Sequence, residues 1–298
     1  MKRLVQYGWV VAVGVSALTM AAARQQVPPG VGWLRDLEYA KVQSKSLALD
    51  LYLPDNPEGK LPLVIWIHGG AWQSGSKDRP PAMQLVRRGY AVASVDYRLN
   101  GEAVFPAQIE DCKAAVRWLR ANAAKYNLNP DRFGAWGSSA GGHLVALLGT
   151  SGGVKELEGT VGGNTDKSSR VQAVCDWFGP TDFLQMDAHA LAEAPFKHDE
   201  ARSPESRLVG GAIQENKDKV KRANPITYVS KDDPPFLIMH GDHDPLVPIH
   251  QSELLYDALK KAGVDVTFRK VDGAGHGFGG PDLMRQVEEF FDKHLKRK

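Results

Sequence analysis

Short apolar runs that alternate with helical stretches constrain the fold of this chain more than any other feature. Residues 63–67 and 236–239 are continuously apolar, which is typical of strands buried on both faces of a sheet. Residues 46–52 instead alternate polar and apolar side chains, as a half-buried antiparallel strand does. Apolar residues recur at helical spacing in segments 106–125 and 249–262. This alternation predicts an α/β fold with a mostly parallel central sheet and helices on both of its faces.

The same pattern predicts one large domain. Further strands are expected at 90–95, 132–136, 171–175 and 264–271, and further helices at 82–88, 143–148 and 283–295. Two stretches interrupt the rhythm: residues 151–169 are rich in Gly, Ser and Thr, and residues 182–227 are long and polar, with a helical segment at 203–210. A long insertion in a compact domain is usually a lid or a wall of a binding site. We therefore expect a linker at 24–33, a domain at 34–298, and a short lid-like insertion at 182–227.

The N-terminal segment has the pattern of a secretory signal peptide. Lys2 and Arg3 precede the mostly apolar residues 4–20, and three alanines follow at 21–23. Cleavage there would leave a mature chain that begins near Arg24 and is exported, either to a periplasm or to the medium. The apolar stretch reaches the lower limit for a membrane span, so a retained N-terminal membrane anchor is the alternative.

Composition excludes some classes of partner. The formal net charge of the 298 residues is +2, and no run of basic residues forms the electrostatic footprint of a nucleic-acid site. We expect no nucleic-acid partner and no stable membrane contact in the mature chain. Cys112 and Cys175 have neither metal-binding nor redox spacing, and the sequence leaves open whether they are free or paired.

The strongest chemical signal is a Gly-Ser-Ser-Ala-Gly motif centred on Ser139. It follows a predicted strand and precedes a predicted helix, which is the context of a nucleophile elbow. The flanking Gly137 and Gly141 allow a sharp turn that exposes the Ser139 hydroxyl. The helix N-terminus that follows would favour negative charge on the reacting oxygen.

A second motif, His-Gly-Gly-Ala-Trp, begins at His68 at the end of a buried strand. Small residues after a strand let backbone N–H groups turn towards a developing oxyanion. We assign the amides of Gly70 and Ala71 to an oxyanion hole, together with that of Ala140. We expect His68 to hold this loop, and Trp72 either to stack on substrate or to pack in the core.

The remaining catalytic groups are expected in two loops that follow the last two strands. A histidine is the usual base for a serine proton, and a carboxylate fixes its tautomer. The order serine, acid, histidine along the chain selects Asp244 and His276.

Neighbouring residues offer alternatives to this assignment. Asp242 lies two positions from Asp244 and is the second candidate for the acid, whereas Asp272 is interpreted as a turn residue. His243 and His250 are expected at the surface. A metal site built from them and His240 lacks compact spacing on one element, so no metal is predicted.

These four motifs together resemble the α/β-hydrolase esterases, over residues 34–296. HGGAW, GSSAG, HGDHDPLVP and GAGHGF occur in the order found there. The chain is most similar to the hormone-sensitive-lipase-like carboxylesterases and to bacterial feruloyl and acetylxylan esterases. The lipase-like branch usually has a third glycine where this chain has Ala71, and usually an N-terminal helical cap. Both departures favour the polysaccharide-ester group.

The resemblance implies an enzyme that forms an acyl-enzyme on Ser139, with His276 as base and Asp244 as its partner, and needs no cofactor. Its expected substrates are small-molecule esters or acetyl and feruloyl esters of plant polysaccharides. A generic short-chain carboxylesterase and a serine peptidase of the same fold are the alternatives. A binding protein that has lost catalysis would lack a member of the triad, and all three residues are present.

Overall fold

The computed structural model describes residues 27–296, and its centre is an eight-stranded sheet. The strands are β1 (Val31–Val42), β2 (Lys45–Pro54), β3 (Leu61–Ile67), β4 (Ala91–Val95), β5 (Leu128–Ser138), β6 (Ala173–Trp177), β7 (Phe236–Gly241) and β8 (Val266–Val271). Their order across the sheet is β1-β2-β4-β3-β5-β6-β7-β8. Only the pairs β1–β2 and β2–β4 are antiparallel, so the predicted mostly parallel sheet is confirmed. The predicted signal segment, and the anchor that is its alternative, lie outside the described residues.

The first strand differs from the prediction for this part of the chain. Residues 24–33 were expected to form a linker, but β1 begins at Val31 and pairs with β2 along most of its length. The register shifts between Leu34 and Leu37 and again between Glu38 and Ala40, so the side chains do not alternate regularly. These bulges remove the period of two that identifies a strand in a sequence.

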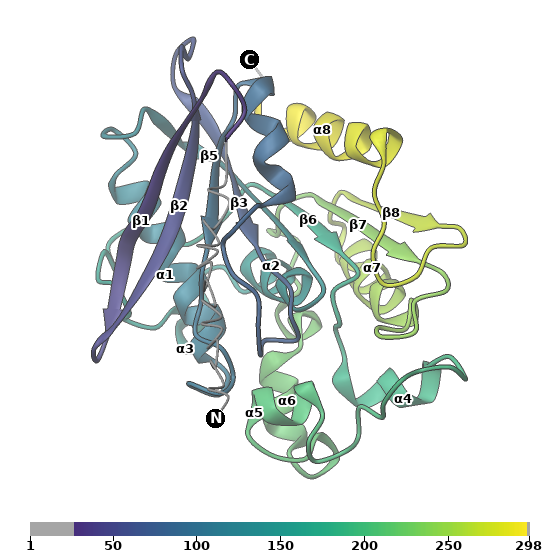
Figure 1. Cartoon of the computed structure of the whole chain (residues 1–298). Helices are drawn as coiled ribbons and strands as arrows, with labels where there is room; N and C mark the ends of the chain where they lie inside the picture. Colours follow the sequence, from purple (N-terminus) through teal and green to yellow (C-terminus); the bar gives the residue numbers. More distant parts are fainter. Residues whose placement is uncertain (1–26, 297–298) are drawn as a thin grey trace, which may run out of the picture.

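Helices cover both faces of the sheet (Figure 1). The α-helices are α1 (Ala107–Ala121), α2 (Ala140–Thr150), α3 (Lys155–Glu158), α4 (Met186–His189), α5 (Pro204–Val209), α6 (Lys217–Ala223), α7 (His250–Ala262) and α8 (Pro281–Leu295). The 3₁₀ helices are η1 (Pro81–Arg88), η2 (Phe183–Gln185), η3 (Ile213–Glu215) and η4 (Pro225–Tyr228).

Each face has its own apolar core. On one face, side chains such as Val116 of α1, Leu144 of α2 and Leu255 of α7 pack against the sheet. On the other, Val86 of η1 and Phe291 of α8 pack on a second buried cluster. Burial of each large apolar side chain contributes about 1.5–3 kcal/mol. Packing on both faces explains why the central strands are continuously apolar in the sequence.

The segment 182–227 forms a group of short helices. Figure 1 shows α4, α5 and α6 gathered beyond one end of the sheet. The predicted helix at 203–210 is α5, and the Ser203 hydroxyl caps it by accepting the amide of Ser206 at 3.0 Å. The amide of Phe105 donates to the carbonyl of Leu208 at 2.8 Å, which ties this insertion to the loop before α1.

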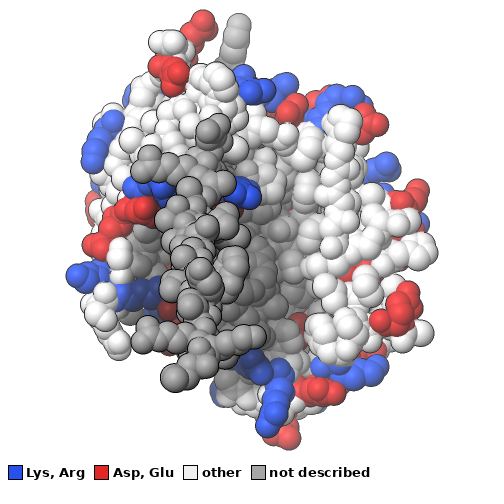
Figure 2. Space-filling model, viewed as in Figure 1, with Lys and Arg blue, Asp and Glu red and all other residues white. Residues whose placement is uncertain are grey.

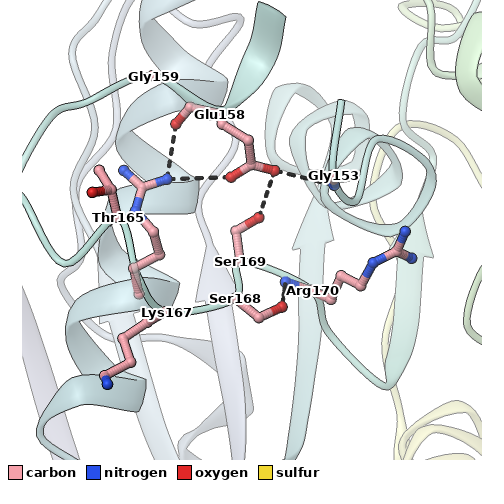
Figure 3. A pocket seen from close by; sticks show the side chains of 9 residues that line it. Gly153, Glu158, Gly159, Thr165, Lys167, Ser168, Ser169 and Arg170 are labelled. Carbon is pink, nitrogen blue, oxygen red and sulfur yellow. Dashed lines mark hydrogen bonds and ion pairs between the residues drawn. The ribbon is translucent and has the colours of Figure 1, made fainter. Parts of the chain in front are cut away.

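Buried charges fix the other interrupting stretch, residues 151–169, between α2 and β6. Lys113 and Arg117 of α1 both contact the carboxylate of Glu158. The same carboxylate also accepts hydrogen bonds from Ser169 and Gly153 (Figure 3). Glu158 and its neighbours line a small hollow of about 200 Å³. Because the polar groups of these residues bond to one another, they anchor the loop to α1.

The surface has no single dominant charge on the side seen in Figure 2, where basic and acidic side chains are scattered around the outline. Among the described residues, no helix combines the length and the apolar character that a membrane span requires.

Candidate active site

Ser139 occupies a strained turn between β5 and α2. Its φ of 55° and ψ of −123° lie in a region that side-chain-bearing residues rarely adopt. The amide of Ser139 donates to the carbonyl of Trp177 at 2.8 Å, so the neighbouring strand β6 holds the turn. Strand, strained serine and helix form the geometry of a nucleophile elbow.

The glycines of the motif are required by close backbone contacts. A Cβ on Gly137 would lie 2.3 Å from the carbonyl oxygen of Gly141. A Cβ on Gly141 would lie 2.1 Å from the carbonyl oxygen of Ile67, at the end of β3. Any larger residue would therefore push the elbow away from the loop that follows β3.

The structure brings the three predicted catalytic residues into one hydrogen-bonded row. His276 Nε2 lies 3.0 Å from Ser139 Oγ, and His276 Nδ1 lies 2.8 Å from Asp244 Oδ2. Because an ionised carboxylate only accepts, Nδ1 carries the proton and Nε2 is free to accept the hydroxyl proton of Ser139. Residues separated by up to 137 positions thus meet at the carboxyl ends of the parallel strands.

Asp244 is held as a buried carboxylate. Its Oδ1 accepts the amides of Leu246 and Val247 at 2.8 and 2.9 Å, and His240 Nε2 lies 3.2 Å from Oδ2. Burial alone would raise the pKa of Asp244, but the hydrogen bonds from His240 and His276 outweigh it and hold this pKa well below the ordinary value. The carboxylate therefore stays charged opposite His276.

The alternative residues lie apart from this row. Asp242 contacts His243 Nδ1 at 2.7 Å and Lys270 at 3.5 Å, and it does not contact His276. His243 is exposed, and Asp272 lies in the turn after β8, as predicted. The ring of His250 stacks on that of His189, with their centroids 3.4 Å apart.

His240 also has a structural environment. It is buried, and its ring nitrogens lie 2.7 Å from Ser252 Oγ and 2.8 Å from the carbonyl oxygen of Val247. Within residues 27–296, no three His, Cys, Asp or Glu side chains are arranged to hold a metal ion.

The predicted oxyanion residues lie beside the elbow. A Cβ on Gly69 would lie 2.8 Å from the carbonyl oxygen of Ser138 and 3.3 Å from Ser139 Cβ, so this loop passes directly over the serine. Gly70 and Ala71 have φ values of 110° and 55°, which turn the backbone sharply after the strand. Within the described part of the chain, the amides of Gly70, Ala71 and Ala140 donate no hydrogen bond. These N–H groups are therefore available to a ligand.

The structure does not place Trp72 as a stacking surface. Its side chain is 1% exposed and packs edge-on against His143 and Phe183, with ring centroids 5.2 and 5.5 Å away. A ring buried on both faces has no free face for a substrate, so the packing alternative describes Trp72.

His68 holds the oxyanion loop, as expected. Its ring stacks on Tyr97, with centroids 4.4 Å apart, and the Tyr97 hydroxyl donates to the His68 carbonyl at 3.0 Å. His68 Nδ1 donates to the carbonyl of Gly69 at 2.7 Å. Side chain and backbone of one residue thus fix the start of the loop.

Aromatic residues surround the histidine loop, and the sequence motifs did not indicate them. Phe178 has a φ of 44° and packs edge-on against His276, with ring centroids 4.7 Å apart. Phe278 packs on Phe178 and Trp177, with centroids 5.1 and 4.9 Å away. This aromatic group supports a loop that is otherwise rich in glycine. Phe178 lies shortly after a predicted strand, which is the signal that could have indicated a site residue.

The sheet order and the Ser139–His276–Asp244 row define a protein of the α/β-hydrolase fold. The model of the BD-FAE family matches residues 49–259, and the chain belongs to this family.

Individual relatives are similar over most of this chain. Esterase LipQ of Mycobacterium tuberculosis is 33% identical over 265 residues, which cover 87% of this chain and 58% of LipQ. The solved structure of a truncated carbohydrate esterase from gut microbiota is 37% identical, with a TM-score of 0.82, and the match covers 89% of this chain and 97% of that one. Est2, an esterase from Thermogutta terrifontis solved with butyrate, is 26% identical with a TM-score of 0.69, over 89% and 93% of the two chains. The chain spans less than two thirds of the length of LipQ.

Proposed function

We propose that this chain is a serine carboxylic-ester hydrolase that acts through an acyl-enzyme. The observation that carries the proposal is the position of His276, which lies within hydrogen-bond distance of both Ser139 Oγ and Asp244. Membership of the BD-FAE family and similarity to proteins named as esterases support it.

The proposed reaction has two halves. Ser139 Oγ attacks the ester carbonyl carbon while His276 Nε2 takes its proton, and the carbonyl oxygen becomes an oxyanion that accepts from the amides of Gly70, Ala71 and Ala140. The C–O bond to the alcohol then breaks, and His276 returns the proton to the leaving alcohol. In the second half, water loses a proton to His276 and attacks the acyl carbon. The C–O bond to Ser139 then breaks, His276 returns the proton to Ser139 Oγ, and the acid is released. Each oxyanion donor contributes about 3 kcal/mol to transition-state stabilisation.

Labelling with a fluorophosphonate probe tests the nucleophile. We expect the wild-type chain to be labelled on Ser139 and to hydrolyse p-nitrophenyl acetate, and the Ser139→Ala variant to do neither. A folded wild-type sample that is not labelled and hydrolyses no ester would overturn the proposal.

For the substrate, we propose an acyl ester carried on a polysaccharide. Similarity to the gut-microbiota protein, which is named a carbohydrate esterase, supports this class. The test compares p-nitrophenyl acetate, methyl ferulate and acetylated xylan, with Ser139→Ala as the blank. Release of acetate from xylan or of ferulate supports the proposal, whereas activity on p-nitrophenyl acetate alone identifies a generic short-chain esterase. Cleavage of a dipeptide amide by the chain would favour a peptidase.

We also propose that the chain is exported, on the basis of the charged, apolar and small residues in segment 1–23. Cell fractionation and N-terminal sequencing of the chain test this. A soluble exported product that begins near Arg24 is expected, and an uncleaved product in the membrane fraction would identify the segment as an anchor.

A further inference from the structure

A polar cavity of about 470 Å³ lies beside the oxyanion loop, separate from the hollow around Glu158. His68 lines it with its side chain, while the next residue, Gly69, passes over Ser139. The cavity therefore lies next to the loop that passes over the reacting serine. A substrate longer than one sugar could extend from the serine over this loop into the cavity.

The cavity combines a buried floor with polar walls. Leu47, Tyr97 and His68 are buried and form part of its lining. Asp96 and Ser46 line it with partly or fully exposed side chains. Charged side chains line it as well, and the ammonium group of the buried Lys77 is held by Asp36 and Asp50 at 2.8 and 3.1 Å. The volume of the cavity lies within the usual range for a small-molecule site.

Two hydrogen-bond acceptors, His68 Nε2 and the carboxylate of Asp96, lie close to each other in this cavity. Because His68 Nδ1 donates its proton to the Gly69 carbonyl, Nε2 of the same ring is an acceptor. Burial lowers the pKa of His68, so the ring stays neutral. In the described residues, His68 Nε2 receives no hydrogen bond, and the nearest charged oxygen is Asp96 Oδ1 at 3.9 Å. Because His68 lines the cavity, a hydrogen-bond donor of a ligand in the cavity can reach this nitrogen.

Asp96 offers further accepting capacity. Its Oδ1 accepts the amide of Lys77 at 2.6 Å, and its Oδ2 has no hydrogen bond within residues 27–296. The pair His68 Nε2 and Asp96 can thus accept from two donors on neighbouring atoms of one ligand. Two adjacent hydroxyl groups of a sugar ring supply this arrangement, since each can donate one O–H and the ring carries no charge that must be desolvated.

We propose that this cavity is a saccharide subsite, in which His68 Nε2 and Asp96 accept hydrogen bonds from neighbouring hydroxyls of a neutral oligosaccharide. The inference rests on the proposed polysaccharide-ester function and deepens it, because it places part of the sugar chain in a cavity beside the oxyanion loop.

Binding of an unesterified sugar tests the subsite without catalysis. We expect calorimetric titration of the wild-type chain with xylotetraose to give a dissociation constant in the millimolar range. In Asp96→Asn, the amide can donate to His68 Nε2 and occupy the acceptor, so binding should weaken at least about tenfold. Ser46→Trp, at the exposed rim, should block the cavity without touching its hydrogen bonds. Absence of wild-type binding at about 10 mM xylotetraose, or binding by both variants equal to that of the wild type, would overturn the subsite.

Kinetics on two substrates separate this inference from the proposed function. Asp96→Asn should raise KM for acetylated xylotetraose at least about five times more than KM for p-nitrophenyl acetate, which is too small to reach the cavity. Asp166→Asn, an exposed carboxylate beside Lys167, is the matched control and should change neither value. An equal loss on both substrates would assign Asp96 to support of the oxyanion loop and contradict the subsite. If the wild-type chain hydrolysed no ester but bound xylotetraose through Asp96, the proposed function would fail and the sugar site would stand.

Discussion

Two aspartates on one loop provide a matched test of the proposed acid. Asp244 contacts His276, whereas Asp242, two residues earlier, contacts His243 and Lys270. In Asp244→Asn the amide can donate to His276 Nδ1, so the imidazole proton moves to Nε2 and the ring can no longer accept from Ser139. We expect kcat to fall by about 10⁴, measured on p-nitrophenyl acetate, while Asp242→Asn changes kcat by less than about twofold.

The outcome distinguishes the two candidates for the acid directly. A large loss in Asp242→Asn with a small one in Asp244→Asn would reverse the assignment. Circular dichroism of both variants provides the control for folding, because Asp244 Oδ1 also accepts two backbone amides.

A second buried carboxylate, Asp176, predicts a pH-dependent stability. Burial raises the pKa of Asp176 from 3.8 to about 7, and the amide of Gly179, which donates to its Oδ1, offsets only part of this. Between these two pH values the folded chain keeps a proton that the unfolded chain has released, so stability contributed at low pH is lost as pH rises towards 7. Asp176→Asn removes this loss. The free energy of unfolding of this variant, relative to that of the wild type, should therefore increase by about 1.4 kcal/mol for each unit by which the pH rises between about 4 and 7.

Urea unfolding at three pH values measures this difference. The exposed Asp166, replaced by Asn, serves as the control and should show no comparable gain with rising pH. A pH-independent difference between Asp176→Asn and the wild type would show that Asp176 ionises in the ordinary range.

The sequence predicts which candidate catalytic residues lie together, because chemistry restricts their type, but it does not predict how a side chain packs. Ser139, Asp244 and His276 each followed a predicted strand, and the parallel sheet places those strand ends together. Trp72 followed a strand in the same way, but its ring turned into the core against His143. No feature of a single sequence specifies which way such a side chain turns.

At the scale of elements, the elbow depends on the close passage of two loops. Gly141 has no room for a side chain because a Cβ would lie 2.1 Å from the Ile67 carbonyl and 2.6 Å from that of His68. Gly141→Ala should therefore lower the free energy of unfolding by about 3 kcal/mol or more, and it should reduce activity by displacing the oxyanion loop. Thermal unfolding and the rate on p-nitrophenyl acetate measure the two effects.

Gly101 provides the comparison for this substitution. A Cβ there would have no atom within 4 Å, and the residue is exposed. Gly101→Ala should change the free energy of unfolding by no more than about 0.5 kcal/mol. Equal stability of the two variants would mean that the contact between elbow and loop relaxes at little cost.

Most elements could be predicted because their periodicity survives in the sequence, and the failures have identifiable causes. The bulges around Asp36 conceal β1, and the helix predicted at 82–88 is a 3₁₀ helix that begins at Pro81. The support of His276 by Phe178 was not foreseen, since it joins the end of β6 to a loop almost 100 residues later.

At the scale of the whole molecule, the sheet separates the two cysteines. Cys112 lies on α1 in the core shared by α1, α2 and α7, whereas Cys175 lies on β6 in the core under η1 and α8. Both are fully buried and unpaired, and burial raises the pKa of both thiols. A disulfide requires Cα atoms within about 7 Å, and it would have to cross the packed sheet, so export into an oxidising compartment should leave both thiols free.

Thiol titration of protein purified without reductant tests this separation. We expect no reaction of the native chain with Ellman's reagent on the timescale of minutes, because a buried thiol with a raised pKa is neither accessible nor ionised. After denaturation both thiols should react, and dithiothreitol should leave the unfolding temperature unchanged. The Cys112→Ala variant should then titrate as a single thiol. A denatured wild-type chain with no reactive thiol would require the two cysteines to meet, which the two separate cores do not allow.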